Sequence, residues 1–175
     1  MVKLRRMLGD IQSQECVSIM RLIETQSAKT LAVWAIGYAK AQYLPIYERE
    51  CLNQPRLREI TTACESFLVG GYKLAEVKPF LKAATQIGRD TEGNAVAQAA
   101  ARAVATACAA IQTPTSSLGF LFYGAAAVAY SKAGLAQAAE VYDVLAAQEL
   151  RRALDALRET AIAEEGNPVK INWNC

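Results

Sequence analysis

The sequence predicts an all-α fold: a single-domain bundle of about seven helices around a central alanine-rich helical hairpin. The hairpin is the stretch NAVAQAAARAVATACAAIQTPTSSLGFLFYGAAAVAY, in which two alanine-dominated segments flank a Thr-Pro-Thr-Ser turn. Alanine has the highest helix propensity, and a helix that is apolar on every face must be buried. Elsewhere, apolar residues recur at helical spacing between short breakers, and no strand-like alternation of useful length occurs.

Length and composition predict one folded domain. The chain has 175 residues, which is near the usual size of a single domain with a substantial core. Hydrophobic residues make up 53% and charged residues 21%, which is too apolar for a disordered chain. We expect one domain over residues 1–175, with residues 1–12 and 166–175 irregular or loosely ordered.

Serine, proline and glycine delimit the first three predicted helices. A first helix is expected over residues 14–25, and Ser27 is a good N-cap for the second. Pro45 should kink or interrupt that second helix, because proline lacks a backbone donor. Pro55 suits the first turn of a third helix, which Gly70-Gly71 ends.

The fourth and fifth helices lead into the turn of the hairpin. The fourth is expected over residues 74–89, with Pro79 near its first turn. Asn94 follows the turn-rich segment DTEGN and can cap the fifth helix. Ser116 or Ser117 can cap the sixth.

Gly134 stops the sixth helix, and a longer seventh is expected over residues 135–165. Its apolar stripe, which should contact the core, comprises Tyr142, Leu145, Leu150, Leu154 and Leu157. Its charged residues are assigned to a solvated face and are Glu149, Arg151, Arg152, Asp155, Arg158 and Glu159. The tail GNPVKINWNC is expected to be irregular, and Trp173 must dock on something to be ordered.

Charge and cysteine content favour a cytoplasmic protein and name no partner. The net charge is +2 with both signs interspersed, so no field selects nucleic acid or an anionic membrane. Four of the five cysteines lie in helical patterns and are interpreted as small apolar core residues. Free cysteines of this kind fit a reducing compartment, and terminal Cys175 is the exception. The basic start is not followed by a continuous apolar region, so no secretory signal is expected. The apolar run Leu118 to Tyr130 is too short for a membrane helix, which needs roughly 20 residues.

The search for catalytic chemistry indicates that the protein is not an enzyme and needs no cofactor or metal. It has no histidine, which excludes Ser-His-Asp and Cys-His systems, histidine-ligated zinc and the Glu-x-x-His motif of di-iron bundles. No glycine-rich phosphate-binding motif occurs. Carboxylate pairs such as Glu48 with Glu50 lie on polar helix faces or in turns. Basic residues near the start and around Arg56 lack a helix-turn-helix signature, so no nucleic-acid contact is expected.

Six side chains are weak candidates for contact with a partner: Arg56, Arg58, Trp34, Tyr38, Arg102 and Tyr123. Arg102 lies in an otherwise apolar helix, where a guanidinium needs an internal partner, an outlet to solvent or a ligand. Trp34 and Tyr38 share one helix face, a pattern typical of a core but also of a pocket. Tyrosine tips can mark the rim of a cleft or an interface.

Three segments resemble the immunity proteins of bacterial polymorphic toxin systems, specifically the all-helical immunity family five. They are RLIETQSAKTLAVWAIGYAKAQYLPIYE, QPRLREI and AAARAVATACAAIQTPTSSLGFLFYGAAAVAY, in that order along the chain. The anchors are Thr30-Leu31-Ala32 with Trp34-Ala35, Pro55-Arg56, Ala105-Thr106-Ala107 and Leu118-Gly119. Members of the family often carry histidines where this chain has Cys108 and Ser116 or Ser117, which puts in doubt any shared polar site built on histidine.

The resemblance implies a small cytoplasmic protein that binds a cognate toxin domain and blocks it by occlusion, without catalysis. We place the expected contact surface at Arg56, Arg58 and the loop before them. Two alternatives stay open: a self-associating helical protein, such as a homodimer that covers an apolar stripe, and a bundle that binds a small ligand in a pocket lined by Trp34, Tyr38 and Tyr123.

Overall fold

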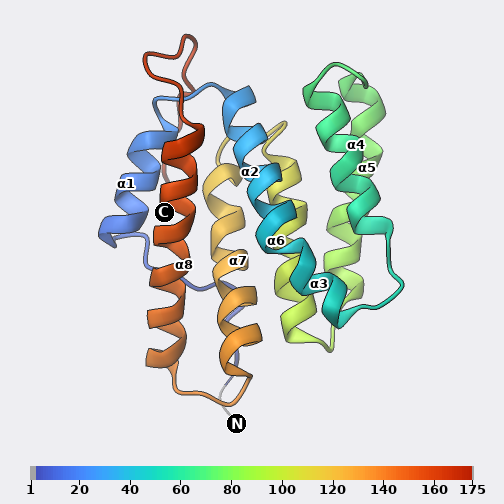
Figure 1. Ribbon diagram of the computed structural model, residues 1–175, viewed down its shortest axis with the longest axis vertical. Coiled ribbons are helices and arrows are strands. Elements are labelled where there is room, and N and C mark those ends of the chain that lie inside the picture. The colour runs from blue at the N-terminus through green and yellow to red at the C-terminus, as the bar shows by residue number, and fades with distance from the viewer. Residues whose placement is uncertain (1–2, 175) are drawn as a thin grey trace.

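Helices and no strand make up the regular structure of residues 3–174, the part of the chain that the computed structural model describes (Figure 1). They are α1 (Gln14–Ile23), α2 (Ala28–Gln42), α3 (Leu44–Glu50), α4 (Arg56–Leu68), α5 (Leu74–Asp90), α6 (Ala95–Ala109), α7 (Ser116–Ala133) and α8 (Ala139–Thr160). The predicted all-α class is confirmed. α2 and α3 together replace the second predicted helix, which is interrupted as Pro45 suggested.

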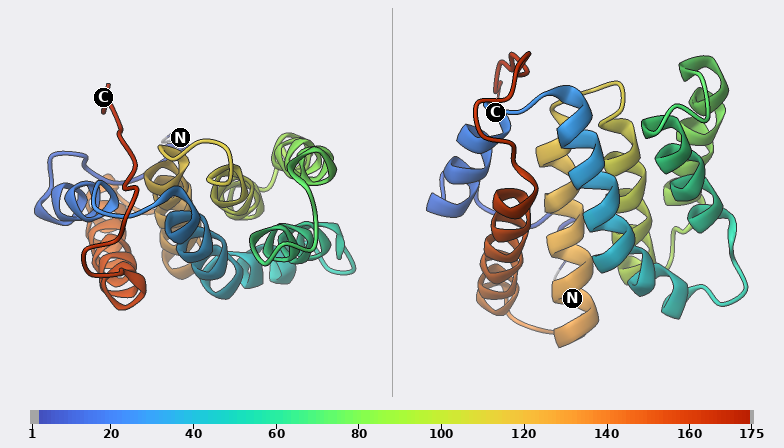
Figure 2. Two further views of the ribbon diagram at one scale, coloured as in Figure 1. Left: turned by 90° about the horizontal axis from the view of Figure 1, so that it is seen from above. Right: turned by 45° about the horizontal axis from the view of Figure 1, so that its top comes forward.

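The alanine-rich hairpin α6–α7 lies at the centre of the bundle. α2, α3 and α5 pack on α6, and α8 packs on α7. Seen from above, α7, α6 and α5 lie in one row and α2, α3 and α4 in a second, while α1 and α8 lie at the end opposite to α4 and α5 (Figure 2). Most alanines of the hairpin are fully buried, and their small side chains let neighbouring helices approach closely.

The predicted caps of α2 and α6 are confirmed. The Ser27 side chain accepts a hydrogen bond from the Thr30 amide, and the Asn94 side chain accepts one from the Ala97 amide. Each cap satisfies one of the amides that the first turn of a helix leaves without an intrahelical partner. Gly134 ends α7 with a φ of 77°, as its position after the last periodic residue predicted.

The predicted serine cap of α7 is wrong. The N-cap position is Thr115, and its side chain makes no capping bond. Ser116 is already the first helical residue, and Ser117 is buried and donates to the Pro114 carbonyl. Thr115 already has a helical conformation, so Ser116 and Ser117 come one and two residues after the N-cap position and cannot cap the helix.

α2 and α3 meet at Tyr43, which ends one helix and begins the other. Pro45 is in the first turn of α3, where its missing amide is harmless, whereas a continuous helix would have needed that donor. The break turns the Tyr43 ring inward, where it is fully buried against Gly124 of α7.

α8 is shorter than the predicted helix at both ends. Residues 135–138 form a connection held by Tyr142, whose hydroxyl donates to the Gly134 carbonyl and accepts from the Gln137 amide. At the other end, Ala161 is extended and the Gln26 side chain accepts a hydrogen bond from the Ile162 amide. Side-chain contacts from distant residues therefore set these limits, which helix periodicity does not encode.

Both terminal segments lack helix but are attached to the bundle. In the first, the Arg5 carbonyl accepts a hydrogen bond from the Tyr130 hydroxyl at 2.6 Å. In the last, the Val169 amide donates to the Gln26 carbonyl, and Trp173 Nε1 donates to Glu24 Oε1 at 2.8 Å. Trp173 thus docks on the corner between α1 and α2.

No helix within residues 3–174 is long and apolar enough to cross a membrane. Cys16, Cys64 and Cys108 are buried in the bundle, and Cys51 is half-buried. Cys175, the exception noted from the sequence, lies outside the described residues.

Candidate functional site

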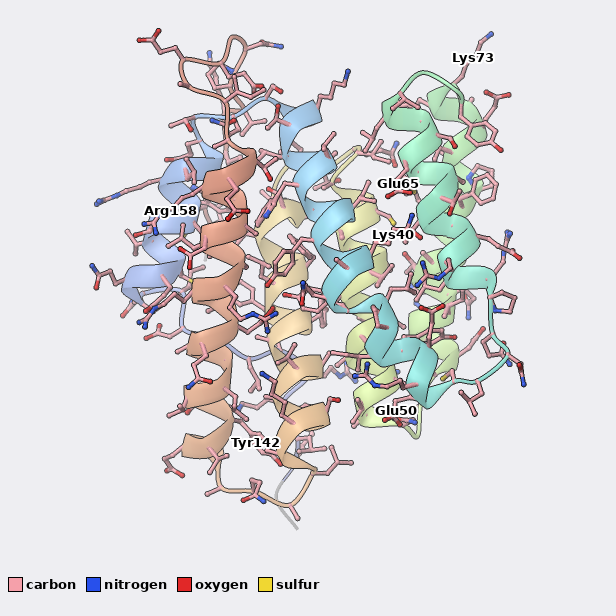
Figure 3. All side chains as sticks on the ribbon, in the orientation of Figure 1. Lys40, Glu50, Glu65, Lys73, Tyr142 and Arg158 are labelled. Carbon is pink, nitrogen blue, oxygen red and sulfur yellow. The ribbon has the colours of Figure 1, made fainter. Side chains whose placement is uncertain are left out.

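The first candidate surface is a hollow between α4 and α5, at one edge of the bundle. This α4–α5 hollow has a volume of about 400 Å³ and is lined by Pro55, Arg58, Glu59, Thr62, Ala63, Ser66, Tyr72 and Phe80. Figure 3 shows how α4 is joined to α2 by an ion pair between Lys40 and Glu65, at 2.7 Å. α4 also packs on α5 and α6, and α5 packs on α6, so the edge that carries the hollow is attached to the bundle through both helices.

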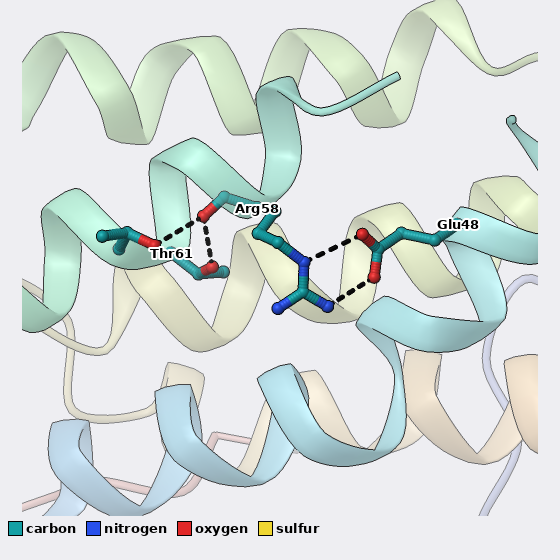
Figure 4. Close-up of polar contacts among 4 residues, drawn as sticks. Glu48, Arg58 and Thr61 are labelled. Carbon is teal, nitrogen blue, oxygen red and sulfur yellow. Dashed lines mark hydrogen bonds and ion pairs between the residues drawn. The ribbon is translucent and has the colours of Figure 1, made fainter. Parts of the chain in front are cut away.

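Arg58 is the most firmly held cation of this hollow. Its Nε and Nη2 donate to the two carboxylate oxygens of Glu48 at 2.9 and 2.5 Å (Figure 4). This bidentate pair connects α3 to α4 across the loop between them, and Arg58 lowers the pKa of Glu48. Because both groups are partly exposed, the pair contributes little to stability, but it fixes the direction of the guanidinium.

Arg56 lies at the start of α4, beside the aromatic part of the hollow. Its guanidinium carbon is 5.4 Å from the centre of the Phe80 ring, a cation–π arrangement. The Tyr72 ring also neighbours Phe80, with the ring centres 6.1 Å apart. Arg56 also approaches Glu59 at 3.6 Å. The structure thus brings Arg56 and Arg58 to one surface, together with two aromatic rings that the sequence analysis did not single out.

The second candidate place is a small cleft between α5, α6 and α7. This arginine cleft has a volume of about 310 Å³ and is lined by Arg6, Thr85, Arg89, Arg102, Ala105, Thr106, Ala109, Ser116 and Tyr123. Arg102 is half-buried and opens into the cleft, so two of the predicted candidates, Arg102 and Tyr123, meet here. No carboxylate of residues 3–174 forms an ion pair with Arg102, so the outlet to this cleft is what accommodates its charge.

Trp34 and Tyr38 lie in the core, which argues against direct contact with a partner. They are 3% and 9% exposed and pack with Tyr43 and Phe120 in a group of tilted and edge-to-face rings. Tyr123 lines the arginine cleft instead, so the pocket expected from Trp34, Tyr38 and Tyr123 is not assembled. The helical spacing of Trp34 and Tyr38 identified a core face.

The prediction that Glu149 lies on the solvated face of α8 is wrong. Its side chain is 1% exposed and accepts hydrogen bonds from the hydroxyls of Tyr38 at 2.8 Å and Tyr43 at 2.9 Å. Both donors reach the same oxygen, Oε2, while Arg152 Nη1 lies 3.3 Å from Oε1 without hydrogen-bond geometry. Burial raises the pKa of Glu149, and the two hydroxyls and Arg152 oppose that rise.

A signal for this burial was present in the sequence. Glu149 comes seven residues after Tyr142 and four before Ala153, so it lies on the apolar face of α8 and not beside it. A carboxylate at the centre of an apolar face must find donors, and tyrosine hydroxyls on facing helices are suitable ones. Glu149, Tyr38 and Tyr43 form a buried network that joins α8 to the α2–α3 junction, and none of them lines either candidate surface.

Within residues 3–174, no group of three or more His, Cys, Asp or Glu side chains is placed to hold a metal ion. Cys108, Ser116 and Ser117, the positions where the sequence resemblance implied histidine in related proteins, differ in their exposure. Cys108 is fully buried, and the neighbouring Cys64 thiol and burial raise its pKa. Ser117 is buried too. Ser116 alone reaches the arginine cleft.

Residues 21–159 match the protein family described as Imm-5 like putative immunity protein. The chain belongs to this immunity family. The match begins in α1, ends in α8 and includes both candidate surfaces except for Arg6. The family resemblance inferred from the three sequence segments is therefore confirmed. No curated protein and no solved structure compared with this immunity protein matches it.

Proposed function

We propose that this immunity protein binds a cognate toxin domain in the cytoplasm and neutralises it by occlusion, without catalysing a reaction. The observation that supports the proposal is the family match, which extends over most of the bundle. A bundle with a tightly packed centre is also suited to such a role, because a rigid binder loses little conformational entropy when it associates.

The α4–α5 hollow is the contact surface that the geometry favours. It combines Tyr72, Phe80 and two arginines, and tyrosine and arginine are the residue types that most often dominate binding energy at interfaces. Arg58 is already oriented by Glu48, so its ordering costs little upon binding. Leu52 precedes α4 and Val69 follows it directly, and both are strongly exposed apolar side chains.

The experiment is co-expression with the C-terminal domain of the toxin encoded beside this protein. Growth rescue and a stoichiometric complex after purification are expected, and light scattering of the free protein and of the complex gives the mass of each. Failure to rescue growth from a toxin domain that is expressed and lethal would remove the proposed function. A free protein of twice the chain mass would add a homodimer to the description.

Arg56→Ala should then weaken the complex by about tenfold or more, because it removes a guanidinium stacked on an aromatic ring at the proposed surface. The matched control is Arg158→Ala on α8. Both arginines are about equally exposed, at 54% and 60%, and both form an i,i+3 pair with an acidic residue. Equal affinities of the two variants, measured by titration calorimetry, would move the contact surface away from α4.

A further inference from the structure

A basic groove runs along the other flank of α5, between α5 and α6. A cavity of about 1040 Å³ between the two helices shares Thr85, Arg89 and Ala109 with the arginine cleft, so the two are parts of one depression. We call this depression the basic groove. It is larger than the α4–α5 hollow, and it extends along α5.

Five cations line the basic groove: Lys78, Lys82, Arg89, Arg102 and Arg6. Neither part of the lining contains an acidic residue. Within residues 3–174, none of the five cations forms an ion pair or a side-chain hydrogen bond. The α4–α5 hollow differs, because Arg58 is neutralised there by Glu48 and Glu59 lines the wall.

The positions of these cations follow from the helices that carry them. Lys78, Lys82 and Arg89 are four and seven residues apart, which places them on one face of α5. That face is opposite to Phe80 of the α4–α5 hollow. The two acids on the helix are engaged elsewhere: Glu76 accepts from the Lys73 amide, and Asp90 accepts a hydrogen bond from Gln86 at 2.7 Å. Neither lines the groove.

Two further features bring Arg102 and Arg6 to the end of the groove. Gly88 lets α6 approach α5, because a Cβ atom at this position would lie 3.1 Å from Cγ of Arg102. The segment that carries Arg6 is fixed on both sides: the Arg5 carbonyl accepts from Tyr130, and the Leu8 amide donates to the Phe122 carbonyl. Arg6 is thus held over the arginine cleft by backbone contacts.

We infer that the basic groove binds an acidic segment of the toxin domain, with its carboxylates on Arg89 and Arg102 and further along on Lys82. The inference rests on the proposed function and specifies that the bound segment of the partner is acidic. Guanidinium groups bind carboxylates through two parallel hydrogen bonds, and the hydroxyls of Tyr123 and Ser116 in the cleft can donate as well. Because the cations of the groove have no ion-pair partner among the described residues, the groove also attracts an acidic partner toward α5 over a distance.

An acidic protein segment suits this groove better than a nucleic acid. Single-stranded nucleic acid binds where several aromatic rings stack on successive bases, and the basic groove has one ring, Tyr123, at its end. The walls between the cations combine alanine, leucine and proline with uncharged threonine and glutamine, so they accommodate both apolar and polar residues of a peptide. The net charge of the chain is only +2, so the charge is concentrated locally.

The test compares two triple variants with equal loss of charge. The groove variant carries Lys82→Gln, Arg89→Gln and Arg102→Gln, in which the glutamine at position 102 keeps the stem that packs against Gly88. The control variant carries Arg21→Gln, Arg49→Gln and Lys170→Gln, three exposed cations away from the groove and without an ion pair within residues 3–174. Thermal unfolding of both variants verifies that they fold like the wild type.

Affinity for the toxin domain is measured by calorimetry at low and high salt. We expect the groove variant to lose about tenfold or more at low salt, with a flatter salt dependence, and the control variant to stay within about threefold of the wild type. A short polyglutamate peptide should compete with the toxin domain for the wild type and not for the groove variant.

Each contrary result has a distinct meaning. Wild-type affinity of the groove variant would overturn the inference and leave the proposed function intact. Absence of any complex with the wild type would remove the proposed function itself. A third result concerns single-stranded oligonucleotides. If the wild type bound them, and the groove variant lost this binding but kept its affinity for the toxin domain, the groove would be a nucleic-acid site and the inference would be wrong.

Discussion

Glu149→Leu is expected to destabilise the bundle by about 3 kcal/mol, which corresponds to a decrease in melting temperature of about 10 °C. The substitution removes the acceptor shared by the hydroxyls of Tyr38 and Tyr43. A buried donor without a partner costs about 1 to 3 kcal/mol, and two such donors would remain. The gain from removing a buried carboxylate offsets part of this cost, so the net loss is smaller than the sum.

Glu149→Gln is the matched control, because its amide oxygen still accepts from both hydroxyls. We expect its free energy of unfolding at neutral pH to lie within about 1 kcal/mol of the wild type. Adding Tyr38→Phe and Tyr43→Phe to Glu149→Leu should recover much of the loss, since polar partners removed together leave no orphaned group. A triple variant as unstable as the sum of its single substitutions would show that packing, and not the hydrogen bonds, makes Glu149 important.

The pH dependence gives this network a second test. Burial raises the pKa of Glu149 in the folded state, so at neutral pH its ionised form costs stability relative to the unfolded chain. As the pH falls through the folded-state pKa toward the ordinary carboxyl value, protonation relieves that cost. The wild type should therefore gain stability relative to Glu149→Gln over this interval, as measured by urea unfolding at each pH. A relative loss over the same interval would mean that the tyrosine hydroxyls and Arg152 lower the pKa.

Gly124→Ala is the second large effect, with an expected loss of about 3 kcal/mol or more. A Cβ atom at this position would lie 2.5 Å from Oη of Tyr43 and closer still to Cζ and Cε2 of the same ring. The ring is fully buried and its hydroxyl is bound to Glu149, so it has no room to move away. α7 would have to shift from the α2–α3 junction.

Gly37→Ala supplies the control for Gly124→Ala. Gly37 is an exposed helical glycine of α2, and a Cβ atom there would meet nothing within 4 Å. Its replacement should stabilise the protein by about 0.5 to 1 kcal/mol, because alanine is the better helix former. Chemical denaturation of both variants gives the comparison, and a similar change in the two would contradict the close contact of Tyr43 with α7.

Local signals of the sequence predicted three helix limits correctly, although the predicted serine cap of α7 was wrong. Ser27, Asn94 and Gly134 mark these three limits, and each acts within four residues of itself. The predicted ends of α8 were wrong because side-chain contacts decide them. Tyr142 holds the connection over residues 135–138, and Gln26 binds the Ile162 amide after the helix. Such contacts exist only after the bundle has formed.

The candidate site was predictable in parts for the same reason. The sequence indicated Arg102 and Tyr123 as separate possibilities, and the packing of α5, α6 and α7 is what joins them with Arg89. Trp34 and Tyr38 stand on a correctly recognised helix face, but periodicity alone does not distinguish a core from a pocket. The burial of Glu149 was not predicted, because a charged residue is normally exposed, although its position in the apolar stripe indicates burial.

The placement of both candidate surfaces on α5 has a consequence for how such a protein can diversify. The central hairpin tolerates few changes, because even one added methyl group at Gly124 meets a buried ring. The outward residues of α5 are exposed and contribute little to the core, so their replacement costs little folding energy. A lineage can therefore alter the charges and the ring of this one helix, and with them the surface that the helix offers to a partner, while the frame that holds the helix remains the same.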